Sequence, residues 1–381
     1  MSIADRLQGK RIVICAGSGG VGKTTTSAAL AMGLAAEGAR VAVVTIDPAK
    51  RLATSLGLEE LGNEPRLVDP QRFADQGLEM HGELWAMMLD AKRTFDELIE
   101  KLSPDDKTRD EVLGNRIYQE LSGAVAGSQE FTAIAKIYEL DQDDAYDVIV
   151  LDTPPSRNAL DFLDAPDRLT GFFEGRALRV FLAPTGLAAR VMGKGTGVVF
   201  SVLKKVTGVD LLTDLSVFFK ALGGLIDGFK ERAEGVKAIL TDPATTFLIV
   251  SSPEREPVDE AIFLRGKLRE AGMPFGGLVV NRVHVAADDE AQTDTLAADL
   301  SGELGDKLAG KVARTLEEFR VLAVRDAASI VRLSKELGEK NPIVIPHLDG
   351  DVHDVEGLLA IRRYLFAEGA EREELLAEAA V

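Results

Sequence analysis

The chain has 381 residues, of which 46% are hydrophobic and 28% are charged, a composition typical of a folded globular protein. Its formal net charge of −18 argues against a general affinity for nucleic acid. It contains no run of 18 apolar residues and no apolar signal-peptide core near its start, so we expect a cytoplasmic protein without an integral membrane segment. The single cysteine, Cys15, is expected to be buried and reduced.

The first predicted strand, residues 11–16, runs directly into a glycine-rich loop. Residues 17–24 read Gly-Ser-Gly-Gly-Val-Gly-Lys-Thr and match the phosphate-binding loop G-x-x-x-x-G-K-[ST] without a mismatch. An Ala-rich helix over residues 25–36 follows, and its N-terminal end adds a positive dipole to the loop amides. This order of strand, loop and helix predicts a binding site for a nucleoside triphosphate.

The positions of the loop have separate predicted roles in binding ATP or ADP. The Lys23 ammonium can reach the β- and γ-phosphates, and the Thr24 hydroxyl can ligate Mg²⁺. Thr25 is expected at the α-phosphate. The backbone of the loop completes the predicted phosphate-binding part of the site, with Gly19, Gly20, Val21 and Gly22.

Short apolar runs recur along the chain at intervals that suit an alternation of strands and helices. They predict an α/β fold, a P-loop NTPase with a mostly parallel sheet and helices on both faces. In such sheets the ligand binds at the carboxyl ends of the strands, so polar residues directly after a strand matter most. The further predicted strands are residues 41–46, 84–89, 148–151, 246–250, 278–280 and 342–345.

Two aspartates follow predicted strands, Asp47 after residues 41–46 and Asp152 after residues 148–151. A lone aspartate at a strand end is more often a helix cap or a turn residue, but two beside a phosphate loop favour metal chemistry. We predict that Thr24, Asp47 and Asp152 organise Mg²⁺, directly or through water. The predicted catalytic residues are Lys23, Asp47 and Asp152.

These motifs resemble the ArsA family of deviant-Walker ATPases, which includes the arsenite-pump ATPase and the ATPase that targets tail-anchored membrane proteins. The resemblance rests on residues 17–24, on Asp-Pro-Ala at 47–49 and on Asp-Thr-Pro-Pro at 152–155. It covers residues 12 to about 361 and is nearest to the actinobacterial relatives of the targeting ATPase. It implies a dimer, either a homodimer or a heterodimer with a paralogue, with nucleotide near the subunit interface.

The resemblance also implies two contacts with the adenine base. Asn281, within Val-Val-Asn-Arg at 279–282, is the candidate for a hydrogen bond to the adenine edge. Pro346, after the last predicted strand, is similar to the loop that covers the base. A turn role for Asn281 stays equally open.

Three departures from the family pattern matter, two for hydrolysis and one for metal binding. The second position of the loop, where the family has a signature lysine that reaches the partner's phosphates, is Ser18. The position of the water-activating aspartate, seven residues after Asp47, is Thr54. One cysteine in the chain excludes an intrachain thiol site for zinc or a metalloid.

Two helical insertions, at about residues 94–140 and 160–240, interrupt what we otherwise expect to be one P-loop ATPase domain over residues 1–381. Residues 103–106 predict a capped helix start. Residues 171–209 carry six basic side chains and one acidic side chain, a net charge of +5. The second insertion fits either a lid packed on its own core or a groove for a hydrophobic client helix, and the resemblance favours the groove. One predicted helical face contains Leu211, Leu215, Phe218, Leu222, Leu225 and Phe229.

The function that we expect is a Mg²⁺-dependent, slowly hydrolysing dimeric ATPase whose nucleotide state controls a helical surface for a partner. A nucleotide-gated binding module with negligible hydrolysis is one alternative, because Ser18 and Thr54 replace hydrolytic residues. A metalloid-efflux ATPase subunit is a weaker alternative, because the thiols are missing. The histidines add no predicted site, since His284 is isolated and His347 lies in an acidic stretch that predicts a solvated loop.

Overall fold

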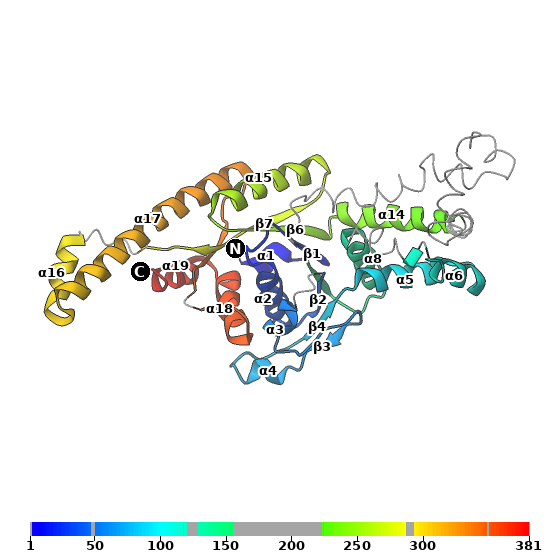
Figure 1. Cartoon of the computed structure of the whole chain (residues 1–381), viewed down its shortest axis with the longest axis horizontal. Helices are drawn as coiled ribbons and strands as arrows, with labels where there is room; N and C mark the ends of the chain where they lie inside the picture. The colour runs from blue at the N-terminus through cyan, green and yellow to red at the C-terminus, as the bar shows by residue number, and fades with distance from the viewer. Residues whose placement is uncertain are drawn as a thin grey trace, which may run out of the picture. The chain divides into compact units, whose positions relative to one another are not determined.

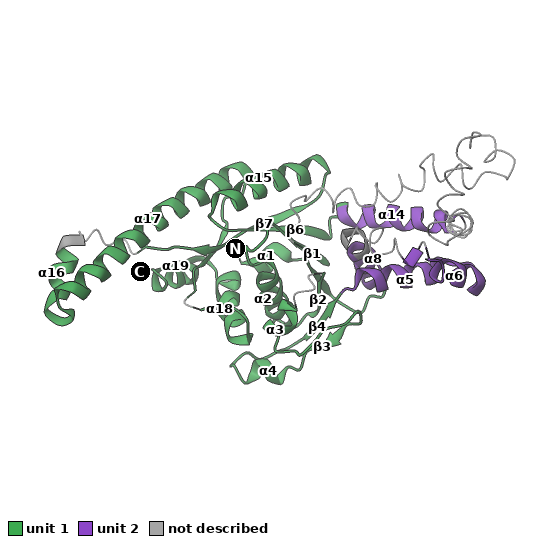
Figure 2. Ribbon diagram, in the orientation of Figure 1, with its two compact units in different colours: residues 1–88, 143–159, 241–381 green, residues 89–142, 160–240 purple. Residues whose placement is uncertain are grey.

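A computed structural model of the chain describes residues 2–46, 50–116, 118–119, 129–154, 223, 225–286, 293–348 and 350–380. The chain divides into two compact units, which are described separately (Figure 2). The first unit comprises residues 1–88, 143–159 and 241–381, and the second comprises residues 89–142 and 160–240. The description of the chain as one ATPase domain with two helical insertions remains a prediction.

The first unit is built on an eight-stranded sheet in the order β3-β4-β2-β5-β1-β6-β7-β8 (Figure 1). Neighbouring strands are parallel except for the edge pair β3 and β4, which is antiparallel. The predicted α/β class with a mostly parallel sheet is therefore confirmed. The strands are β1 (Ile12–Ala16), β2 (Arg40–Thr45), β3 (Arg66–Leu67), β4 (Glu83–Met88), β5 (Val148–Asp152), β6 (Thr245–Ser251), β7 (Phe275–Val283) and β8 (Ile343–Pro346).

Strand β3 is the strand that the sequence pattern missed. Its two residues are exposed and pair only with β4, so they leave no apolar run to detect. Strand β7 begins at Phe275, before the predicted start at residue 278. The prediction began too late because Gly276 and Gly277 interrupt the apolar pattern of the strand. The buried strands carry apolar side chains on both faces, as expected for a sheet that is covered on both sides.

Helix α2 (Lys23–Ala36) packs against one face of the sheet and is almost entirely buried. Its small side chains allow close packing with α18 (Val355–Phe366), since a Cβ atom at Gly33 would lie 2.1 Å from the Phe366 ring. Helices α15 (Arg255–Glu270) and α17 (Asp306–Leu337) lie on the opposite face (Figure 1). The remaining helices of this unit are α1 (Ile3–Leu7), α3 (Arg51–Ser55), α4 (Gln71–Ala74), α16 (Thr293–Leu304) and α19 (Gly369–Glu378).

The described part of the second unit is helical, with α5 (Ala91–Leu102), α6 (Asp106–Leu113), α8 (Gln129–Gln142) and α14 (Ile226–Thr241). Helix α6 begins as predicted, because the Asp105 side chain caps it by accepting a 2.7 Å hydrogen bond from the Thr108 amide. Leu225 and Phe229 of the predicted helical face are buried, and the Phe229 ring stacks on Phe95 at 5.6 Å. The rest of that face, residues 211–222, and the basic segment 171–209 lie outside the described residues.

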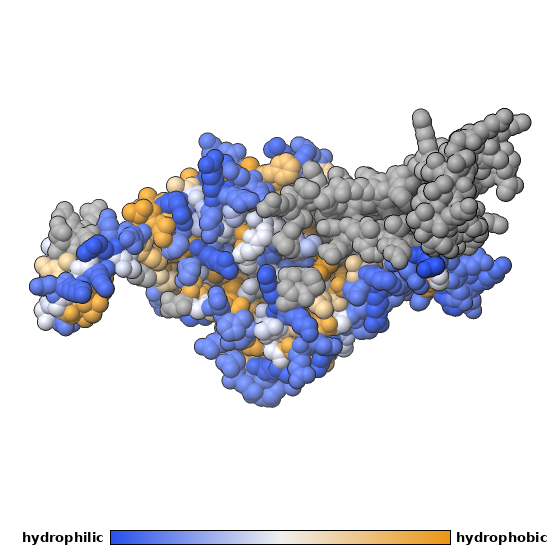
Figure 3. Space-filling view, viewed as in Figure 1, coloured by the Kyte–Doolittle hydropathy of each residue, from blue (hydrophilic) through white to orange (hydrophobic). Residues whose placement is uncertain are grey.

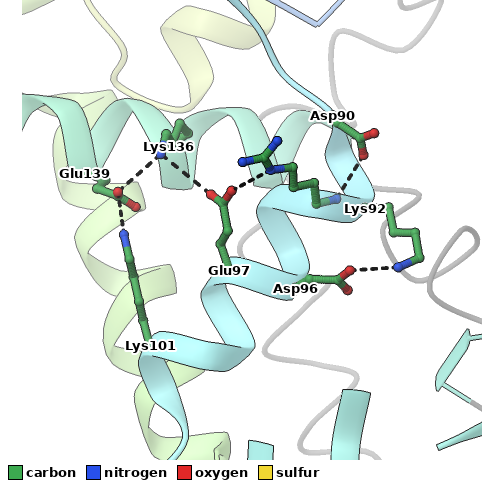
Figure 4. Close-up of polar contacts among 8 residues, drawn as sticks. Asp90, Lys92, Asp96, Glu97, Lys101, Lys136 and Glu139 are labelled. Carbon is green, nitrogen blue, oxygen red and sulfur yellow. Dashed lines mark hydrogen bonds and ion pairs between the residues drawn. The ribbon is translucent and has the colours of Figure 1, made fainter. Parts of the chain in front are cut away.

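An ion-pair network crosses this helical unit (Figure 4). Lys136 on α8 is buried between two carboxylates, 3.8 Å from Glu97 on α5 and 3.3 Å from Glu139 on its own helix. Glu139 also pairs with Lys101 of α5 and with Arg232 of α14, at 2.5 and 3.6 Å. A buried lysine is tolerated only when it is paired, so this network fixes how the three helices pack. Among the described helices, none has both the length and the apolar character that crossing a bilayer requires.

Candidate nucleotide-binding site

The glycine-rich loop connects the end of β1 to the start of α2, at the carboxyl edge of the parallel strands. Two of its glycines adopt left-handed backbone angles, with φ of 78° at Gly20 and 91° at Gly22. Gly17 is required by a close approach, because a Cβ atom there would lie 2.0 Å from the Val250 carbonyl oxygen. The glycines therefore let the chain curl tightly beside β6 before α2 begins.

Lys23 is the first residue of α2 and is 6% exposed. Its Nζ atom donates a 2.7 Å hydrogen bond to the carbonyl oxygen of Ser18, so the ammonium lies inside the curl of the loop. The predicted phosphate-binding lysine is thus placed with the loop amides and the helix N-terminus. Together these groups form a positive site for an anion.

Asp152, the last residue of β5, is fully buried directly behind the loop. Its Oδ2 atom accepts hydrogen bonds from the Thr24 hydroxyl at 2.7 Å and from the Thr45 hydroxyl at 2.8 Å. The parallel register brings these groups together, since Thr45 and Asp152 are paired residues of β2 and β5. A carboxylate beside a threonine hydroxyl is a set of hard oxygen ligands that suits Mg²⁺.

Asp47 and Thr54 follow β2, as the sequence places them. Asp47 itself lies outside the described residues, which include its neighbour Ile46 at the carboxyl edge of the sheet. Thr54 is exposed on α3, and its hydroxyl donates a 3.0 Å hydrogen bond to the Lys50 carbonyl oxygen. The Thr54 side chain has no carboxylate with which to activate water.

Cys15 lies within β1, beneath the same site. Burial raises the pKa of its thiol to about 12, and the nearby Asp152 carboxylate adds to the increase despite an opposing hydrogen bond with Ser27. The sulfur is therefore a neutral packing group at physiological pH, as the sequence predicted, and not an available thiolate.

A cleft of about 890 Å³ opens beside the loop, within the size range of small-molecule sites. Gly20, Gly22, Lys23, Thr24 and Thr25 line it from the loop side. Residues at and just beyond the carboxyl ends of β7 and β8 line it as well. These are Asn281, Arg282, His284, Pro346, His347 and Leu348.

Asn281 connects the cleft wall to the loop. Its Nδ2 atom donates a 3.0 Å hydrogen bond to the Val21 carbonyl oxygen, and its Oδ1 atom accepts one from the Arg282 amide. The side chain lies over Gly22, where a Cβ atom would be 2.3 Å from Nδ2. This arrangement gives Asn281 a role in positioning the loop, and its contact with adenine stays a prediction.

The cleft wall contains a second polar contact, which was not predicted from the sequence. His284 contacts Asp326 of α17 twice, through its backbone amide at 3.0 Å and its Nδ1 atom at 2.7 Å. Asp326 is fully buried, and the His284 ring also stacks on His347 at 5.6 Å between centroids. No local pattern could reveal this contact, because 42 residues separate His284 from Asp326.

Comparisons with known proteins show which proteins this chain is similar to. The chain is 28% identical over 274 residues to the ATPase GET3 of Malassezia globosa, covering 71% of this chain and 72% of that protein. It is 26% identical over 375 residues to an uncharacterized protein of Streptomyces coelicolor, covering 96% and 85%. A putative arsenical pump-driving ATPase of Aquifex aeolicus is 26% identical over 284 residues, covering 72% and 63%.

The family model described as an anion-transporting ATPase, ArsA, matches residues 10–327. The match includes the loop, Asp152 and Asn281, and it extends through most of α17. The chain therefore belongs to the ArsA family of ATPases and is an ATP-hydrolysing enzyme.

Proposed function

We propose that this protein binds ATP and Mg²⁺ in the cleft beside the loop, hydrolyses ATP slowly, and acts as a dimer. In this proposal the nucleotide state of the dimer controls a helical surface that binds a partner. The observation that carries the proposal is the buried Asp152 carboxylate held by Thr24 and Thr45 directly behind a complete phosphate loop.

The residues of the loop have distinct tasks in this scheme. When nucleotide binds, the Lys23 ammonium gives up its hydrogen bond to the Ser18 carbonyl oxygen and binds phosphate oxygens instead. It thereby neutralises part of the phosphate charge. The Thr24 hydroxyl keeps donating its proton to Asp152 and so presents its free lone pairs outward. Thr24, Asp47 and Asp152 would hold Mg²⁺, which supplies charge neutralisation at the β- and γ-phosphates when it is bound.

Slow hydrolysis follows from two side chains. Ser18 has no cation to stabilise charge that develops on the partner's phosphates, a contact typically worth a few kcal/mol in a site that excludes water. Thr54 has no carboxylate to orient or activate the attacking water. We expect turnover about 10²-fold below that of relatives that keep both groups.

The partner surface is proposed from the sequence of the second insertion, residues 160–240. Its apolar, locally basic segment suits a hydrophobic helical client. The protein pairs either with itself or with a paralogue, and a paralogue that carries the missing lysine would complete one of two sites. Activity that rises when such a paralogue is added would identify the heterodimer.

Nucleotide titration tests the site. Lys23→Ala should weaken binding of a fluorescent ATP analogue about 100-fold or more, because it removes the loop ammonium. Lys307→Ala, on the exposed start of α17, is the matched control and should bind like the parent. Equal affinity in Lys23→Ala and the parent, with the fold intact by circular dichroism, would place the nucleotide elsewhere.

Two alternatives are separated by hydrolysis assays. A binding module with negligible turnover would bind ATP but show no Mg²⁺-dependent product in a single-turnover experiment. A metalloid-efflux subunit would be stimulated by arsenite. We expect no stimulation, because the chain has one cysteine and that thiol is buried.

A further inference from the structure

Large exposed apolar side chains of the described residues gather on one group of helices. Seven of the eight lie on α15, α16 and α17, and three valines of α17 are the most exposed of them. Val321, Val324 and Val331 are 62%, 73% and 68% exposed. Figure 3 shows apolar surface along α17 on the face in view. An apolar patch of this kind indicates contact with another protein surface.

The three valines belong to one continuous stripe along α17, in which every residue is exposed. Successive members are four, three, four, three and four residues apart, the spacing of a coiled-coil seam. The opposite side of the helix packs on the body of the unit and includes the buried Asp326. The stripe consists of Glu317, Val321, Val324, Ala328, Val331 and Lys335.

The members of the stripe are spaced symmetrically about residue 326, and its two ends carry opposite charges. Val321 and Val331 lie five residues on either side of the centre, and Val324 and Ala328 lie two on either side. Glu317 and Lys335 lie nine on either side. They are 18 residues apart, which is five full helical turns, so they share one line on the helix.

This pattern favours a second copy of α17 as the partner and an antiparallel orientation of the two helices. When a second α17 packs antiparallel across a two-fold axis, each Glu317 meets a Lys335 and each Val321 meets a Val331. The larger Val324 then faces the smaller Ala328. Parallel packing would instead place Glu317 on Glu317 and Lys335 on Lys335, which is repulsive.

We propose that the α17 stripe is a contact surface for a second copy of this chain, packed antiparallel. The contact is independent of the nucleotide site, so it forms without ATP. A helix pair over residues 317–335 is about 27 Å long and buries less than a standard interface of roughly 1,600 Å². By itself it therefore gives a weak, concentration-dependent dimer.

Charge reversal tests the proposal on the full chain without nucleotide, by sedimentation over a concentration series. Glu317→Lys alone puts lysines at both ends of the stripe, and Lys335→Glu alone puts glutamates there. Each variant should self-associate about tenfold more weakly than the parent. An equimolar mixture of the two should associate about as strongly as the parent, because each lysine then faces a glutamate.

The equimolar mixture of the two charge-reversal variants is the decisive measurement. Residues 317 and 335 are about 27 Å apart on one helix, so they cannot pair within a chain. Val324→Glu should also reduce association at least tenfold, since it puts a charge in the seam. Leu308→Glu is the control, because Leu308 is 50% exposed but lies on another side of the same helix.

Three results would overturn the proposal. One is a parent that stays monomeric up to about 100 µM protein. The second is a mixture that associates no better than either variant alone. The third is a Leu308→Glu variant that weakens association as much as Val324→Glu. Dimerisation that appears only with ATP would support the proposed nucleotide-gated dimer and count against this contact.

Discussion

Substituting Gly22 by alanine tests the physical basis of the loop geometry. Gly22 precedes α2 with φ of 91° and ψ of 27°, a left-handed conformation that costs roughly 1–2 kcal/mol for a residue with a Cβ atom. The new Cβ would lie 2.3 Å from the Asn281 Nδ2 atom, so Asn281 must move away. That movement breaks its hydrogen bond to the Val21 carbonyl oxygen, worth about 1–3 kcal/mol for a buried group.

Gly22→Ala should therefore lower the free energy of unfolding by about 2–5 kcal/mol. Urea unfolding monitored by fluorescence of the single tryptophan, Trp85, measures this value. Trp85 lies in β4, within the same unit as the loop, so its signal reports the stability of that unit.

Gly9→Ala is the matched control. Gly9 also has a left-handed φ of 74°, but a Cβ atom there would meet nothing within 4 Å, so only the backbone cost of about 1–2 kcal/mol applies. Asn281→Ala should remove most of the additional cost of Gly22→Ala, and the double variant should be less destabilised than the sum of the two. Equal losses for Gly22→Ala and Gly9→Ala, or simple additivity with Asn281→Ala, would refute this reasoning.

Three further predictions concern single side chains. Asp152→Asn should retain ATP binding but lose Mg²⁺-dependent turnover, because it removes the charge that Thr24 and Thr45 hold in place; titration and hydrolysis assays on one preparation check this. Cys15 should not react with a thiol reagent at pH 8 until the protein unfolds, because burial raises its pKa to about 12. Burial alone would raise the pKa of Glu139, but Lys101 and Lys136 hold that pKa below its ordinary value. The stabilising effect of the Glu139 carboxylate is therefore present above its pKa in the unfolded chain and is lost as the pH falls through its pKa in the folded protein. Glu139→Gln should therefore flatten the acid side of the stability profile in urea titrations at several pH values.

Much of the fold could be predicted because its signals are local. The loop, the following helix and Asp152 each lie in or beside a contiguous apolar run, and parallel strands bring their carboxyl ends together. The register between neighbouring strands cannot be predicted from any one segment, because it depends on how two distant segments pair. For that reason Thr45 was not predicted as a partner of Asp152, although it stands two residues before Asp47.

The side-chain contacts in the cleft wall could not be predicted from the sequence either. Asn281 was predicted as a candidate for a hydrogen bond to adenine, but its contact with Val21 depends on how β7 lies beside the loop, 260 residues away in the chain. The contact between His284 and Asp326 depends on α17 packing against the sheet. Such contacts follow from tertiary packing, which periodicity and motif spacing do not encode.

Hydrolysis of MgATP by the isolated protein under single-turnover conditions tests the central claim most directly. We expect bound ATP, a slow rate that requires Mg²⁺, and a higher rate in the Ser18→Lys/Thr54→Asp variant, which restores the missing cation and carboxylate. Fast Mg²⁺-dependent turnover in the parent, with no gain in that variant, would contradict it.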